Sequence, residues 1–111
     1  MDNPAVVSAL AALAQESRLA AFRLLVQAGP EGMAATRIAE ALGIPPSSLS
    51  FHLKELTHAQ LVNQNKAGRS LIYSANFATM NGLLSFLTEN CCGGAPCSTA
   101  GLSTCSQGEC S

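Results

Sequence analysis

The sequence predicts a mainly α-helical domain with one small β-hairpin, and three observations support this fold class. Apolar residues recur at helical spacing through most of the first 90 residues. A proline pair, Pro45–Pro46, opens the most strongly patterned of these stretches, and Gly43 closes the stretch before it. After both, two short apolar runs flank the basic, glycine-containing segment Lys66–Arg69, which is typical of a hairpin.

The first predicted helix runs from Pro4 to about Ala14, with an apolar face made of Val6, Val7, Leu10 and Leu13. Nearly every other residue in it is alanine, so the helix is apolar almost all round and needs cover on more than one side. In a chain of 111 residues we expect a partner subunit to supply that cover. The alternative is a helix that packs only on its own domain.

A second helix is predicted over Glu16–Gly29, ended by Gly29–Pro30, with an inward face of Leu19, Phe22, Leu25 and Val26. Arg18 and Arg23 lie off that face and are most simply solvated, although a phosphate contact is an alternative for Arg18.

Two further helices follow closely. The first covers Ala35–Gly43, with an apolar stripe of Ile38, Ala39, Ala41 and Leu42. The second starts at the proline pair and buries Leu49, Leu53 and Leu56. Two short helices joined by a tight turn with glycine are typical of a helix-turn-helix, whose second helix enters the DNA major groove. A plain helical hairpin is the alternative for this pattern alone.

The residues after the long helix favour the DNA-binding interpretation. Leu61–Val62 and Leu71–Tyr73 are strand-like around the basic turn, and Met33–Ala34 is a candidate third strand. A helix-turn-helix followed by a basic hairpin is a winged helix, and that order is more specific than either part. A last helix is predicted within 75–90, with Asn76 as its N-cap and a stripe of Met80, Leu83, Leu84 and Leu87.

The stretch from Ser47 to Leu56, continued through Ala59–Val62 and the hairpin, resembles the metal-responsive winged-helix repressors of the ArsR/SmtB family. The resemblance covers roughly Ala9 to Leu87, and Gln60 stands where that family usually has glycine. It implies a homodimer built by the first and last helices. Such a dimer places two recognition helices to read an inverted repeat in operator double-stranded DNA. It also implies a repressor rather than an enzyme.

Candidate DNA contacts lie on the long helix, the hairpin and the helix before them. We expect Ser47, Ser48, Ser50 and Phe51 to face base edges or nearby phosphates, and Lys54, Lys66 and Arg69 to meet phosphates. Arg37 and His52 complete the set. The alternatives are a helix-internal hydroxyl for Ser50 and a half-buried packing residue for His52. The net charge is −1, but four of the six Lys and Arg residues lie between Met33 and Tyr73, where the only acids are Glu40 and Glu55.

The composition changes at Cys91, so we divide the chain into a DNA-binding and dimerisation domain, 1–90, and a Cys/Gly/Ser-rich tail, 91–111, which we expect to be flexible. All five cysteines lie in this tail. The N-terminus has Asp2 instead of the positive segment of a secretory signal, so we expect a cytoplasmic protein without a membrane. In that reducing compartment, cysteines are more typically ligands or sensors than disulfides.

Cys91, Cys92 and Cys97 are the candidate metal ligands, because the Gly93–Gly94 pair lets the chain fold back on itself. Three convergent thiolates suit trivalent arsenic (arsenite) or antimony, whereas zinc prefers four ligands. Cys105 or Cys110 is an auxiliary candidate. Zinc sensors of the resembled family carry Asp and His on the last helix, which has none here. Other members carry Cys-x-Cys in the first helix of the DNA-binding pair, and Ala34–Arg37 has no thiol.

We therefore predict a repressor that trivalent arsenic or antimony releases from its operator, with no catalytic cofactor. Another soft metal (cadmium, lead or zinc) and thiol oxidation are the alternatives for the inducer. Oxidation is less favoured, because a helix C-terminus without a nearby cation disfavours the thiolate. A thiol metallochaperone and an unused tail are further alternatives.

Overall fold

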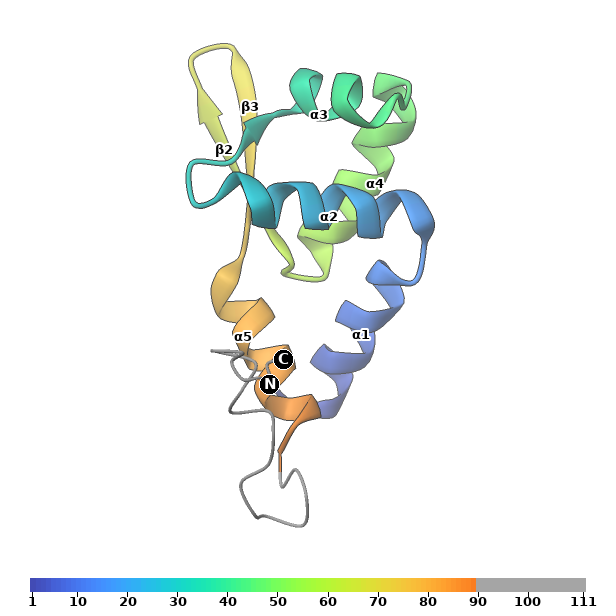
Figure 1. Ribbon diagram of the computed structural model, residues 1–111, viewed down its shortest axis with the longest axis vertical. Helices are drawn as coiled ribbons and strands as arrows, with labels where there is room; N and C mark the ends of the chain where they lie inside the picture. The colour runs from blue at the N-terminus through green and yellow to red at the C-terminus, as the bar shows by residue number, and fades with distance from the viewer. Residues whose placement is uncertain (90–111) are drawn as a thin grey trace, which may run out of the picture.

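The computed structural model describes residues 1–89 and shows five helices and a small antiparallel sheet (Figure 1). The helices are α1 (Asn3–Leu13), α2 (Glu16–Ala28), α3 (Ala35–Leu42), α4 (Pro46–His58) and α5 (Phe77–Leu87). The strands are β1 (Met33–Ala34), β2 (Val62–Ala67) and β3 (Ser70–Ala75). The predicted fold class, mainly helical with a β-hairpin after a helix-turn-helix, is confirmed.

The three strands pair in the order β1-β3-β2. Met33 lies opposite Tyr73, so the expected pairing of the short first strand with the hairpin is confirmed. The strands β2 and β3 extend beyond the apolar runs that predicted them, because backbone hydrogen bonding continues through polar residues up to the Ala67–Ser70 pair. A two-residue turn, Gly68–Arg69, therefore forms the tip of the hairpin.

Gly32 allows the chain to approach the centre of this sheet. Its φ of +72° lies in the left-handed region, and a Cβ at this position would collide with the backbone carbonyl oxygen of Tyr73. The Tyr73 side chain is buried, and its hydroxyl accepts a hydrogen bond from Gln64 Nε2 at 3.2 Å. Burial raises the pKa of Tyr73 above the ordinary value of a phenol.

Side-chain caps begin three of the helices. Asn76 Oδ1 accepts from the Thr79 N–H at 3.1 Å, which confirms the predicted N-cap of α5. Asp2 and Gln15 cap α1 and α2 in the same way. Gly43 ends α3 in a left-handed conformation, also as predicted.

The core is formed mainly by Leu, Ile and Ala side chains of all five helices together with residues of β2 and β3. Leu49, Leu53 and Leu56 of α4 are fully buried, as predicted. The prediction was wrong for Leu19, which is 44% exposed, and for Ala41, which is exposed. The predicted Phe22 of α2 and the predicted Ile38 and Ala39 of α3 are buried, and Ala21 of α2, which was not predicted, is buried as well.

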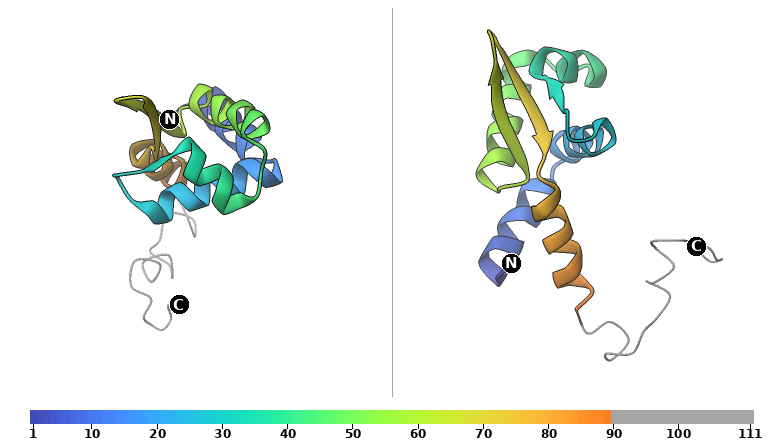
Figure 2. Two further views of the ribbon diagram at one scale, coloured as in Figure 1. Left: turned by 90° about the horizontal axis from the view of Figure 1, so that it is seen from above. Right: turned by 90° about the vertical axis from the view of Figure 1, so that its left-hand side faces the viewer.

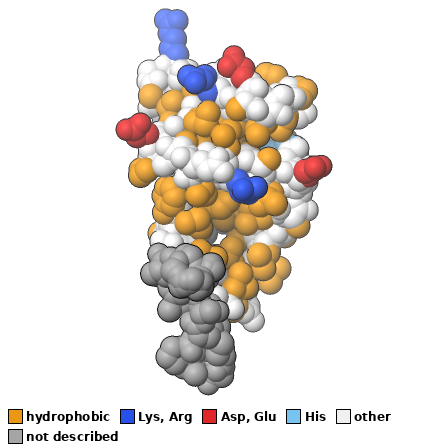
Figure 3. All heavy atoms as spheres, in the orientation of Figure 1, with side chains coloured by type: hydrophobic (Ala, Val, Ile, Leu, Met, Phe, Trp, Pro, Cys, Tyr) orange, Lys and Arg blue, Asp and Glu red, His pale blue; other side chains and the backbone are white. Residues whose placement is uncertain are grey.

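The predicted apolar faces of α1 and α5 are only partly buried. Helix α1 packs by Val6, Ala9 and Ala12, and leaves Val7 63% and Leu10 41% exposed. Helix α5 buries Leu83 and leaves Leu84 and Leu87 more than half exposed. These two helices lie together at one end of the molecule, where Figure 3 shows hydrophobic side chains gathered over the surface.

Within residues 1–89, no single helix has the length and apolar composition needed to cross a membrane. Helices α1 and α2 meet that requirement only when taken together, and they are bent by 102° at their junction.

Candidate nucleic-acid interface

Helix α4 has one face in the core and the opposite face open to solvent. Successive residues of an α-helix are about 100° apart, so Ser47, Phe51 and Lys54 lie on the side opposite the three buried leucines. All three are exposed, and Ser48 and Ser50 are exposed on the flanks of the same face. The proline pair begins the helix just before these serines, with Pro46 as its first residue. The first two turns therefore present small hydroxyls and an aromatic ring.

The hairpin lies on the same side of the molecule as α4. In both views of Figure 2, α4 and β2–β3 are on one side, and α2 and α3 are on the other. Lys66 near the end of β2 and Arg69 in the turn are both exposed. Two exposed cations thus lie at the hairpin tip, on the side of the fold that carries α4.

Arg37 and His52 differ from the other candidate residues. Arg37 is exposed on α3 and lines an open cavity of about 400 Å³ with Met33 and Ile72, beside the sheet. His52 is half-buried, and within residues 1–89 its buried Nδ1 atom has no hydrogen-bond partner. Its ring lies edge-on to the ring of Phe51, with 5.9 Å between the two ring centres. The half-buried position of His52 is compatible with both roles considered from the sequence, a packing residue and a DNA-contact residue.

Two features at this surface were not predicted from the sequence. Gln60, just after α4, has a φ of +66°, a conformation that L side chains other than Asn and Asp rarely adopt. Arg18 of α2 places its guanidinium carbon 5.6 Å from the centre of the Phe51 ring. The resembled family usually has glycine at the position of Gln60, and this was a signal in the sequence for the positive φ. No spacing rule links Arg18 to a residue 33 positions later, so the sequence held no signal for the second.

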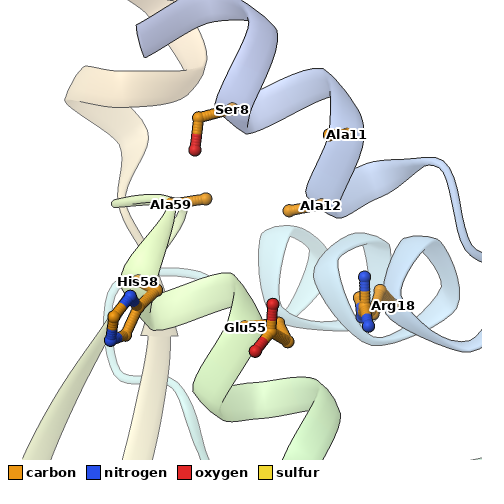
Figure 4. Close-up of a pocket in the computed structure, with 7 residues that line it drawn as sticks. All are labelled: Ser8, Ala11, Ala12, Arg18, Glu55, His58 and Ala59. Atoms are coloured by element: carbon orange, nitrogen blue, oxygen red, sulfur yellow. The ribbon is translucent and has the colours of Figure 1, made fainter. Parts of the chain in front are cut away.

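An open cleft of about 260 Å³ lies between α1 and the second half of α4 (Figure 4). Ser8 and two alanines of α1 line one wall, and Glu55, His58 and Ala59 line the other, with Arg18 of α2 at the end. Within residues 1–89 no three His, Cys, Asp or Glu side chains are grouped to hold a metal ion. The predicted ligands Cys91, Cys92 and Cys97, and the auxiliary candidates Cys105 and Cys110, lie outside the described residues.

Comparison with known proteins agrees with this arrangement. A family model described as a helix-turn-helix domain matches residues 13–65. The chain is 41% identical over 69 residues to the HTH-type transcriptional regulator NmtR of Mycobacterium tuberculosis (strain ATCC 25618 / H37Rv), a match that covers 62% of this chain and 55% of that protein. The chain thus spans only about half the length of this curated relative.

Solved structures give longer matches. NolR from Sinorhizobium fredii is 30% identical with a TM-score of 0.61, over 78% of this chain and 83% of that one. An ArsR-like transcriptional regulator from Rhodococcus sp. RHA1 is 28% identical with a TM-score of 0.67, over 76% of each chain. The chain belongs to the ArsR family. Its fold is therefore the winged helix-turn-helix of ArsR-family transcriptional regulators, in which α3 and α4 form the helix-turn-helix and β2–β3 forms the wing.

The fold also agrees with a dimer. The winged helix-turn-helix DNA-binding domain Mb0332 from Mycobacterium bovis, described as a possible ArsR-family regulator, is homodimeric in solution. It is 26% identical to this chain with a TM-score of 0.62, over 78% of this chain and 81% of that one. The exposed apolar surface of α1 and α5 is consistent with the same oligomeric state.

Proposed function

We propose that this ArsR-family protein is a homodimeric repressor that trivalent arsenic or antimony releases from operator DNA. The observation that carries the DNA-binding part is the shared side of α4 and the wing. Helix α4 carries the exposed serines, Phe51 and Lys54, and it lies on the same side of the fold as the wing, whose Lys66 and Arg69 are also exposed. Short hydroxyl side chains and an aromatic ring read base edges and thymine methyl groups, while Lys and Arg meet phosphates.

The dimer would use α1 and α5. Both helices leave large apolar side chains open in the single chain: Val7, Leu10, Leu84 and Leu87. Burial of such a surface against a partner lowers the free energy by roughly 25 cal/mol per Å² of apolar area. A second copy supplies the same apolar face, so a two-fold interface is self-complementary. Two recognition helices then face successive major grooves of an inverted repeat.

The inducer would bind Cys91, Cys92 and Cys97. In the sequence, Cys91 comes four residues after Leu87, the last residue of the proposed dimer helix. An ion that joins these thiols therefore acts close to the residues that set how the two subunits pack. Three sulfur ligands match the pyramidal coordination of trivalent arsenic and antimony. Binding displaces the thiol protons, so it needs no preformed thiolate.

Release follows if the inducer binds the DNA-free dimer more tightly than the DNA-bound dimer. A shift at the dimer helix changes the spacing between the recognition helices. A coupling free energy of about 1–3 kcal/mol between the two sites is typical. Because coupling is reciprocal, operator DNA weakens the affinity for the metalloid by the same factor.

The test is fluorescence anisotropy of the reduced dimer on labelled duplex DNA from its own promoter, titrated separately with arsenite, antimonite, zinc and cadmium. We expect arsenite or antimonite to release the DNA. We expect the release to disappear in the Cys91→Ser, Cys92→Ser and Cys97→Ser variants, each with unchanged DNA affinity. Ser98→Ala is the matched control, since it changes the tail next to Cys97 without removing a thiol.

The other outcomes are equally informative. Release by zinc or cadmium alone would support the repressor function and contradict trivalent arsenic or antimony as the inducer. Loss of DNA only after thiol oxidation would replace the metalloid with a redox signal. Failure of the unmodified dimer to bind its promoter would reject the DNA-binding function itself.

A further inference from the structure

Arg18, near the start of α2, contacts the recognition helix. Its backbone N–H donates to Gln15 Oε1 at 2.9 Å, within the cap of α2. Its guanidinium lies over the ring of Phe51, 5.6 Å from the ring centre to Cζ. Phe51 is 55% exposed and lies in the middle of the proposed DNA-reading face. The Arg18 guanidinium therefore contacts Phe51, the aromatic side chain of that face.

The contact with the ring leaves the hydrogen-bonding capacity of Arg18 unused. A guanidinium has five N–H donors, and an aromatic face attracts its charge without accepting them in the way that an oxygen does. Within residues 1–89, the buried Arg18 Nε has no hydrogen-bond acceptor. The side chain is only half-buried, and it lines the open cleft shown in Figure 4. The half-buried guanidinium therefore lies at an open surface, while its buried Nε is out of reach of an external anion.

DNA phosphate is the anion that this position favours. Phe51 is one helical turn from Ser47 and from Lys54, so Arg18 lies beside the residues proposed to contact the operator. Guanidinium binds phosphate oxygens through charge-assisted and often paired hydrogen bonds.

We propose that Arg18 is a DNA-contact residue supplied by α2, which binds an operator phosphate while its stack on Phe51 orients that ring toward the bases. The proposal rests on the DNA-binding function proposed above. It adds a contact from outside the helix-turn-helix and the wing, and it ties one phosphate contact to the position of a base-reading side chain.

The salt dependence of operator binding tests the phosphate contact. Each phosphate that a protein neutralises contributes about 0.9 to the slope of log K against log salt concentration on duplex DNA. We expect Arg18→Met to reduce this slope by about one and to weaken binding severalfold at moderate salt. Arg18→Lys keeps the charge, so we expect it to keep most of the slope.

Arg23→Met is the matched control, because Arg23 is an exposed arginine on the same helix. We expect it to leave the slope unchanged. Thermal unfolding of each variant separates a change in stability from a change in DNA contacts, since a purely structural role for Arg18 would not alter the salt slope. If Arg18→Met is too unstable to measure, Arg18→Gln, which keeps a long polar side chain, takes its place.

The stack on Phe51 is tested by combining variants. In a Phe51→Leu background, we expect the loss caused by Arg18→Met to be smaller than in the unmodified protein, because the ring no longer holds the guanidinium in place. An unchanged salt slope in Arg18→Met would overturn the phosphate contact, and strict additivity with Phe51→Leu would overturn the coupling. Both results are distinct from failure of the proposed function, in which the unmodified dimer does not bind its promoter.

Discussion

The two ends of this molecule differ in the surface that they expose to water, because one is apolar and the other is positively charged. The end formed by α1 and α5 leaves Val7 and Leu87 more than half exposed, although both are large and apolar. The end formed by α3, α4 and the wing carries four of the six cations in the chain. Burial of the first surface away from water is favourable, and so is binding of an anion by the second surface. One chain by itself completes neither surface, so its function depends on two partners of different chemistry.

The largest effect is expected from charging the apolar end. The double variant Leu84→Glu/Leu87→Glu places carboxylates in the proposed dimer interface, where burying them without partners costs several kcal/mol. We expect the dimer dissociation constant to rise by at least about 100-fold, or roughly 3 kcal/mol. Sedimentation equilibrium measures the change. Leu71→Glu, at an exposed leucine of the wing, is the control and should leave the dimer intact.

The next largest effect is expected at Gly32, in the loop between α2 and β1. Gly32→Ala places a Cβ against the Tyr73 carbonyl at a positive φ. We expect the free energy of unfolding to fall by about 2–4 kcal/mol, as measured by urea denaturation. Gly68→Ala shares the positive φ but meets no atom within 4 Å, so we expect a loss of only about 1 kcal/mol. Equal losses in the two variants would contradict the steric explanation.

The wing should contribute to affinity and not to assembly. In Lys66→Ala/Arg69→Ala we expect operator binding to weaken about tenfold and the salt slope to fall by roughly two, because two phosphate contacts are lost. The dimer dissociation constant should not change. Anisotropy at several salt concentrations and sedimentation of the same sample measure both properties. A dimer weakened by these substitutions would show that the two surfaces are not independent.

The smallest effect is expected at Gln60, between α4 and β2. Its left-handed conformation carries strain that glycine does not have. We expect Gln60→Gly to raise the free energy of unfolding by about 0.5–1 kcal/mol, since part of the gain is offset by the greater freedom of glycine in the unfolded chain. Gln60→Ala retains the Cβ and should show little gain in the same denaturation experiment.

Much of the DNA-binding half was predictable because its signals are local. The proline pair, the leucine spacing of α4, the glycine after α3 and the Asn76 cap each act within one or two helical turns. The basic hairpin and its pairing with Met33–Ala34 followed from the same kind of pattern. The assignment of Cys91, Cys92 and Cys97 as ligands remains a prediction, since these residues lie outside the described part of the chain.

The sequence by itself determined approximately where the helices begin and end, because capping, turn geometry and hydrophobic period depend on near neighbours. The strands β2 and β3 extend beyond the apolar residues that predicted them, because their pairing continues through polar residues. Only the tertiary structure decided which sides of α1 and α2 are covered. A helix rich in alanine and leucine offers several apolar faces, and packing against the other helices selected Val6 and Ala9 over Val7 and left Leu19 exposed. The contact of Arg18 with Phe51 has the same origin, because it exists only once α2 crosses α4.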